Sequence, residues 1–116
     1  MNDAPVPGLA FPERRKAVRL PVAIPIELRH DRGFSLYATS DLSEGGAFFP
    51  RSIPHPVGAR LSLSFRLPGD DLTVSCAGEV VNVPDQHQLG MGVRFLDLSS
   101  DDAARLAAFT QQGGVA

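Results

Sequence analysis

Residues 61–83 read LSLSFRLPGDDLTVSCAGEVVNV, and this stretch indicates the fold most clearly. In its first seven residues, leucine or phenylalanine occupies every odd position, and serine or arginine occupies every even position. Because strand side chains point alternately to opposite faces, this pattern predicts a strand that is buried on one face. Residues 68–71 (PGDD) are typical of a turn, and Leu72, Val74 and Cys76 then continue the alternation. The stretch therefore predicts two strands joined by a tight turn.

The same period of two recurs on both sides of this stretch. Further strand candidates are residues 22–28, 34–40, 47–49 and 91–95. Turns or irregular connections are predicted at 30–33, 41–46, 50–58 and 84–90. Pro25 falls on the outward parity of the first candidate, which suggests a sheet edge or a bulge. About six short antiparallel strands with Gly/Pro turns indicate a small closed barrel or a sandwich.

The C-terminal part of the chain has a helical pattern instead. Ser99 and Ser100 are suitable N-cap residues, and the two aspartates that follow suit the positive end of a helix dipole. Leu106 and Phe109 fall at helical spacing, and Gly113 is expected to end the helix. The fold class is therefore mainly all-β with one C-terminal α-helix.

Composition limits the classes of protein that the chain could belong to. Its 116 residues make one domain, with 43% hydrophobic residues and a formal net charge of −2. This charge argues against a general polyanion binder, and the lack of tryptophan argues against a stacking surface for single-stranded nucleic acid. We expect residues 1–12 to be a flexible lead-in and residues 113–116 a flexible tail. Without an apolar membrane span or a signal-peptide pattern, we expect a cytoplasmic protein without membrane insertion.

A basic segment lies just before the first predicted strand. It contains the spacing Arg15-x-x-x-Arg19, with Arg14 directly before it. Arginine offers planar donors that grip phosphates bidentately and can also pair with the O6/N7 edge of guanine. The spacing places Arg15 and Arg19 on one face in either a helix or an extended chain. A solvated basic linker is the alternative interpretation of this segment.

A second motif, Asp41-x-Ser43-x-x-Gly46, breaks the strand pattern. An ionised aspartate is an acceptor only, which suits the N1–H and N2–H₂ edge of guanine, and a serine hydroxyl can bond a phosphate. Gly45 and Gly46 follow in the same turn. Gly46 is expected to allow positive φ and a close approach of a ligand. The alternative interpretation is an Asx-turn between strands, where the same residue types are common.

The two motifs, in this order and on a small β-rich domain, resemble the PilZ domain family. The segment Leu89-Gly90-Met91-Gly92-Val93-Arg94-Phe95 is similar to the final strand of that family. The resemblance covers roughly residues 13–110. It implies a six-stranded antiparallel β-barrel over residues 13–112 that binds cyclic di-GMP, a bacterial second messenger. The basic segment at residues 13–20 would be its nucleotide-binding arm.

The resemblance also implies roles for particular residues. Its ligand-binding residues would be Arg14, Arg15, Arg19, Asp41, Ser43, Gly45 and Gly46. An arginine at position 14 is associated in this family with an intercalated dimer of the nucleotide. A single-domain member would signal to an unidentified effector protein, which we expect to occur through ordering of the arm. The alternative is an adaptor of the same family that has lost nucleotide binding and acts through protein contacts.

The remaining polar residues give little indication of catalysis or of a cofactor. Cys76 lies on the inward parity and is expected to be a small core residue. The histidines at 30, 55 and 87 fall in predicted turns without neighbouring ligands, so no metal site is predicted. No histidine or lysine is placed by the sequence to activate Ser43. We therefore expect a binding protein and not an enzyme.

Overall fold

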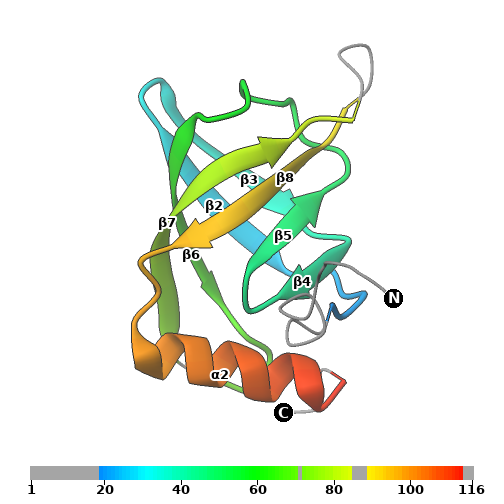
Figure 1. The fold of residues 1–116 in the computed structure, drawn as a ribbon, viewed down its shortest axis with the longest axis vertical. Coiled ribbons are helices and arrows are strands. Elements are labelled where there is room, and N and C mark those ends of the chain that lie inside the picture. Colours follow the sequence, from blue (N-terminus) through cyan, green and yellow to red (C-terminus); the bar gives the residue numbers. More distant parts are fainter. Residues whose placement is uncertain (1–18, 71, 85–88, 114–116) are drawn as a thin grey trace, which may run out of the picture.

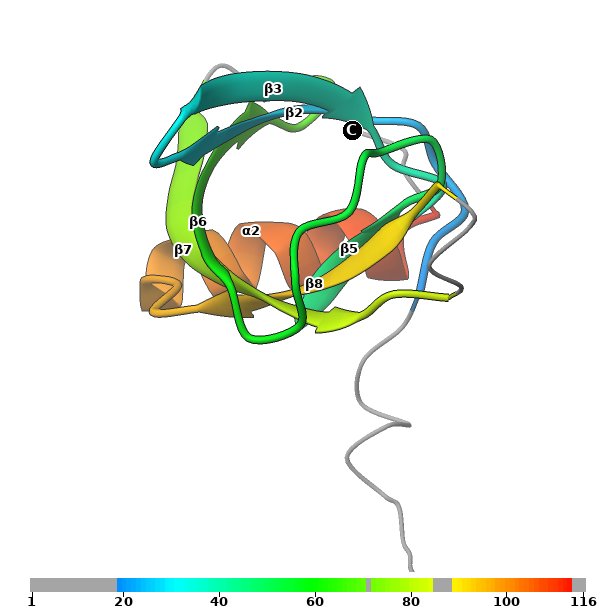
Figure 2. The ribbon, with the colours of Figure 1, turned by 90° about the horizontal axis from the view of Figure 1, so that it is seen from above.

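The computed structural model describes residues 19–70, 72–84 and 89–113. Their strands form one antiparallel sheet of seven strands in the order β3-β2-β6-β7-β8-β5-β4. The strands are β2 (Pro25–His30), β3 (Gly33–Ala38), β4 (Asp41–Ser43), β5 (Gly46–Phe49), β6 (Arg60–Arg66), β7 (Thr73–Asn82) and β8 (Met91–Leu96). The sheet curls around an interior, and helix α2 (Ser100–Gln111) lies across one end (Figures 1 and 2).

The central strands follow the sequence pattern closely. In β6, Leu61, Leu63 and Phe65 are buried while Ser62 and Arg66 are exposed. Strand β7 pairs with β6 over seven residues and continues to Asn82, with a bulge between Val80 and Asn82 where it pairs with β8. The predicted alternation is therefore confirmed for the strands that form the middle of the sheet.

The predicted number of strands was too low, because residues 41–46 are not simply a turn. Asp41–Ser43 forms the short strand β4, which pairs with β5 on one side. On the other side, Leu20 and Leu42 exchange backbone hydrogen bonds of 2.8 and 2.9 Å. The chain just before β2 therefore runs along β4. Since β4 is at one edge of the sheet and β2 lies next to the other edge strand, β3, this segment connects the two edges of the curled sheet.

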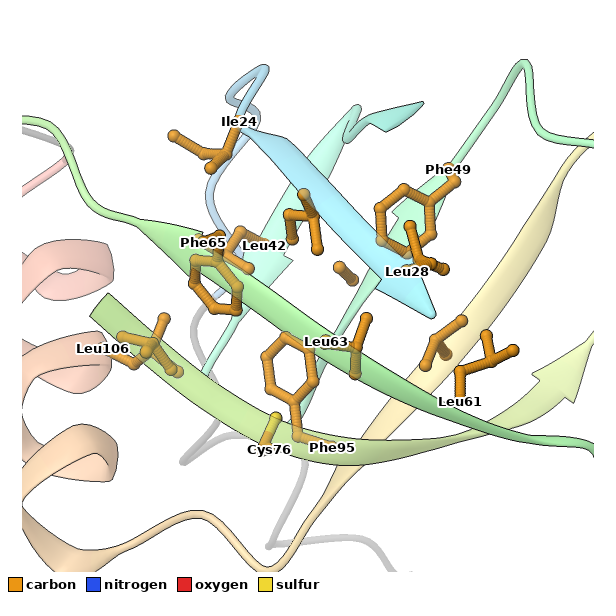
Figure 3. Packing of buried hydrophobic residues seen from close by; sticks show 14 of the residues in the cluster. Ile24, Leu28, Leu42, Phe49, Leu61, Leu63, Phe65, Cys76, Phe95 and Leu106 are labelled. Atoms are coloured by element: carbon orange, nitrogen blue, oxygen red, sulfur yellow. The ribbon is translucent and has the colours of Figure 1, made fainter. Parts of the chain in front are cut away.

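The interior of the curled sheet is filled by aliphatic and aromatic side chains. Figure 3 shows Leu28, Leu63, Phe65 and Phe95 inside the barrel, with Leu106 extending from α2. The rings of Phe65 and Phe95 are stacked with centroids 6.0 Å apart. Burial of this apolar surface is the main source of stability for a domain of this size.

Helix α2 begins and ends as the sequence predicts. The Oγ of Ser99 accepts a hydrogen bond from the backbone N–H of Asp102 at 3.1 Å. Gly113 adopts φ +69°, the left-handed conformation typical of a residue just past a helix end. Leu106 and Phe109 are buried against the barrel, so the helix closes one end of the core.

Candidate functional site

The second motif lies on the β4–β5 hairpin. Asp41 pairs with Phe48 and Ser43 pairs with Gly46, which leaves Glu44 and Gly45 as the two-residue turn. The backbone carbonyl of Gly45 accepts from the N–H of Phe95 in β8 at 2.9 Å. The turn is therefore held against the neighbouring strand, and the motif has a fixed position on the barrel.

Ser43 is at the centre of the hairpin and is almost completely buried, with 1% of its surface exposed. Its Oγ accepts from the backbone N–H of Gly45 at 3.1 Å and donates to the carbonyl of Gly46 at 3.4 Å. A buried hydroxyl with such partners stabilises the turn. The Asx-type alternative is therefore partly right, since Ser43 has a clear structural role.

Arg19 joins the first motif to the second. Its Nη1 donates to the Oγ of Ser43 at 3.4 Å, and its Nη2 lies 3.2 Å from the Oδ1 of Asp41. The backbone bridge between Leu20 and Leu42 brings Arg19 to this position, because it holds the chain before β2 against β4. The structure therefore brings together Arg19, Asp41 and Ser43, three of the residues assigned to the predicted site.

The carboxylate of Asp41 keeps an acceptor available. Its Oδ1 is buried and has no hydrogen-bond donor among the described residues. The 3.2 Å separation from Arg19 is an ion-pair distance, but the guanidinium N–H is not aligned for a hydrogen bond. Since buried polar atoms are rarely left without a partner, this oxygen would gain from a donor, which a ligand can bring only if the side chains that cover it move aside.

The two glycines of the motif have different surroundings. Gly46 does not adopt positive φ, and a Cβ there would collide with the backbone carbonyl of Val93 and lie 3.2 Å from the Cα of Arg94. The expected positive φ is therefore wrong, and β8 occupies the space that a Cβ would need, while the role of Gly46 toward a ligand stays a prediction. At Gly45, a Cβ would meet only the Oγ of Ser43, at 3.8 Å. The open side of the turn is at Gly45.

Two further residues of the predicted site, Arg14 and Arg15, lie outside the described residues. The same holds for most of the arm, residues 13–20, of which only Arg19 and Leu20 are described. The roles assigned to Arg14 and Arg15 therefore stay predictions.

Two other polar groups beside the site were not predicted from sequence. Thr39 is buried, and its Oγ1 donates to the carbonyl of Val22 at 2.6 Å and accepts from the N–H of Ile24 at 3.0 Å. Arg94 lies opposite Gly46 on β8 and forms an ion pair with Glu79 at 2.6 Å. The hydrogen bonds of Thr39 and the position of Arg94 both depend on which segments pair and in which register. The sequence does not indicate this for segments so far apart.

Other groups with possible chemistry lie elsewhere. Burial, followed by the nearby charges of Asp97 and Asp102, raises the pKa of the Cys76 thiol to about 12, so it is a core residue as predicted. The described residues contain no cluster of three or more potential metal ligands. In the same part of the chain, no helix is long and apolar enough to cross a membrane.

The fold and the site together define a small antiparallel β-barrel with a polar site along one hairpin and a helix across one end. The chain belongs to the PilZ domain family, since the family model described as PilZ domain matches residues 13–112. A comparison with curated proteins finds no match.

Solved structures with the same fold include a PilZ domain and two longer proteins. The Bacillus subtilis inhibitor of motility (MotI/DgrA) superposes with a TM-score of 0.72 and 18% identity, covering 85% of this chain and 50% of that chain. The PilZ domain of YcgR from Escherichia coli, solved with c-di-GMP, gives 0.62 and 17%, covering 85% and 90%. The K. pneumonia MrkH–c-di-GMP complex gives 0.61 and 19%, covering 85% and 51%. The chain thus spans about half the length of the first and third of these proteins.

Proposed function

We propose that this chain binds cyclic di-GMP between the arm and the β4–β5 hairpin and transmits the signal to an effector protein. The observation that supports this proposal most directly is the convergence of Arg19 on Asp41 and Ser43. It unites the two motifs in one place, although they are more than twenty residues apart in sequence. Among the similar structures, those of YcgR and MrkH contain c-di-GMP. The proposed activity is binding, without catalysis.

The chemistry of the site suits a nucleotide with two phosphates and two guanines. The guanidinium of Arg19 is exposed and can bond a phosphate or a guanine O6/N7 edge while it stays close to Asp41. The Oδ1 of Asp41 can accept from a guanine N–H, which would supply its missing donor. We assign Arg15 the same role as Arg19, and Arg14 a role in binding a second, intercalated nucleotide.

Calorimetric titration with cyclic di-GMP tests the binding proposal. Removing one charged hydrogen bond costs roughly 1.5–3 kcal/mol, so Arg15→Ala and Arg19→Ala should each weaken binding about 10–150-fold. Arg32→Ala, which removes an exposed arginine from the β2–β3 turn, is the matched control and should bind like the wild type. The same titration gives the stoichiometry, which should fall from two nucleotides to one in Arg14→Ala. Unchanged affinity in both arm variants would refute the assigned site.

We further propose that nucleotide binding orders the arm and thereby changes the surface presented to the effector, in the cytoplasm. Thr39, which directly follows β3, is hydrogen-bonded to Val22 and Ile24. Through these bonds, a change in the arm can alter the position of β3. Amide hydrogen exchange of residues 10–20 should slow markedly at saturating cyclic di-GMP, because coupled ordering protects backbone amides. Equal exchange with and without the nucleotide would exclude this mechanism while leaving binding itself intact.

A second candidate is an adaptor of the same family that does not bind nucleotide. It is favoured by the burial of Ser43 and by the ion pair of Arg19 with Asp41, which give both motifs a purely structural use. An adaptor would show no binding heat in the titration above. Its Arg15→Ala and Arg19→Ala variants would be less stable than the wild type, and like the wild type they would not bind cyclic di-GMP.

A further inference from the structure

The edge strand β3 carries a row of backbone groups without a backbone partner. The β2–β3 hairpin has a two-residue turn, so His30↔Gly33 is a hydrogen-bonded pair, and such pairs alternate along an antiparallel ladder. The N–H and C=O groups of Phe34, Leu36 and Ala38 therefore point away from β2. None of them bonds to backbone elsewhere in residues 19–70, 72–84 and 89–113.

Two residues after Ala38, the next outward-facing backbone N–H of this row does have a partner. The N–H of Ser40 donates to the carbonyl of Phe48 in β5 at 2.9 Å, so the chain leaving β5 starts beside this edge. That chain then contains Pro50, Pro54 and Pro56, which have no N–H to contribute to a ladder. It reaches β3 through the backbone N–H of Ile53, which donates to the hydroxyl of Tyr37 at 3.2 Å. Among the residues that the structure describes, the edge of β3 is thus left without a ladder partner.

The side chains of this edge are apolar and exposed. Phe34 is 62% exposed and Leu36 is 66% exposed. Both lie on the outer face, because they pair with Arg29 and Glu27, whereas Leu28 of β2 points into the core. Residues 33–40 contain no charged side chain. Edge strands that avoid pairing with other chains commonly carry inward charges, lysines or prolines, and β3 has none of these.

We propose that a second copy of this chain pairs antiparallel with β3, with the two-fold axis at Ser35. In this register Phe34 of each copy lies opposite Leu36 of the other, so the outward N–H and C=O groups of these two residues are satisfied and two apolar cross-strand pairs form. A register centred on Leu36 would also pair Ala38, but it would place Phe34 opposite the small Ala38 and form no direct phenylalanine–leucine pair. The sequence of β3 therefore favours the axis at Ser35.

The surroundings of β3 suit such an interface. Arg29 lies over the Phe34 ring, 5.6 Å from its centroid, and forms an ion pair with Glu27 at 3.2 Å. These charges lie one strand away from the edge and would rim an apolar centre, which is the usual arrangement of an interface. Because a single strand from each copy buries little area, the dimer should be weak and concentration-dependent. This inference does not depend on nucleotide binding.

Disulfide trapping tests the register directly. Opposite residues of a non-hydrogen-bonded pair have Cα atoms about 4.5 Å apart, so Ser35→Cys should give a disulfide dimer on mild oxidation. Ala38→Cys is the matched control, because its two copies would be roughly 20 Å apart in the same register. The native Cys76 is buried with a raised pKa and should stay reduced in both variants. Equal trapping of the two variants would overturn the proposed register.

Sedimentation analysis tests the association itself. The wild type should show reversible dimer formation as its concentration rises toward about 1 mM, a range suited to weak complexes. Leu36→Lys should be monomeric throughout, since it places two charges in the apolar centre. Leu72→Lys replaces another apolar residue, 62% exposed, outside β3, and should dimerise like the wild type. A wild type that stays monomeric over the whole range overturns the proposal.

Discussion

Gly45 and Gly46 are neighbours in one turn but have different surroundings, which leads to opposite predictions. Gly46→Ala should lower the free energy of unfolding by about 1–3 kcal/mol, because its Cβ would press against the backbone of β8, which cannot move aside cheaply. Gly45→Ala should be neutral or slightly stabilising, because its Cβ would make only ordinary contact with Ser43. Urea unfolding of both variants measures the difference.

This comparison also separates folding from binding at the motif. If Gly46 served only to admit a ligand, Gly46→Ala would unfold like the wild type and lose affinity alone. Equal stability of the two variants would therefore contradict the role of Gly46 in strand packing. Any loss of affinity in Gly45→Ala, at unchanged stability, would place the ligand on the open side of the turn.

Helix α2 is held to the β6–β7 turn by one arginine. The guanidinium of Arg105 contacts Asp70 at 2.8 Å and Asp102 at 2.6 Å, and it donates to the carbonyl of Leu72 at 2.7 Å. The hydrogen bond from Arg105, followed by that from the backbone of Leu72, lowers the pKa of Asp70 from its ordinary value of 3.8. The position of the helix is therefore linked to the charge of Asp70.

The sign of the resulting pH dependence follows from the lowered pKa. The contribution of Asp70 to stability is present above pH 3.8 and is lost as the pH falls through its pKa in the folded protein. Between about pH 7 and about pH 2, the wild type should lose more of its unfolding free energy than Asp70→Asn, which has no charge to lose. Glu44→Gln, outside this cluster, should follow the wild type. Parallel profiles for wild type and Asp70→Asn would contradict the link.

Across the whole molecule, the features that the sequence predicts well are those with a long uninterrupted period. The alternation in residues 61–67 and the helical spacing of Leu106 and Phe109 correspond to buried faces in the structure. Strand β4 could not be predicted in this way, because it has three residues and depends on pairing with Leu20 and β5. The surroundings of Gly46 likewise depend on β8, nearly fifty residues later in the chain.

The connection between β5 and β6 carries a titratable side chain that should affect the stability of the whole domain. It contains His55, whose ring lies 4.8 Å from that of His30 at the end of β2. Burial, followed by the charge of His30, lowers the pKa of His55 from 6.5, and the nearby Asp31 opposes this shift. Packing of the two rings therefore favours a neutral His55.

A lowered histidine pKa makes the folded protein more stable at higher pH. The contribution is fully present above pH 6.5 and is lost as the pH falls through the pKa of His55 in the folded protein, because the unfolded chain then binds more protons. Urea unfolding between about pH 8 and pH 5 should show a larger loss for the wild type than for His55→Gln, which keeps a polar side chain without the titration. His30→Gln should also flatten the profile, since it removes the repelling charge. A wild-type slope that survives both substitutions would place the titrating group outside this pair of rings.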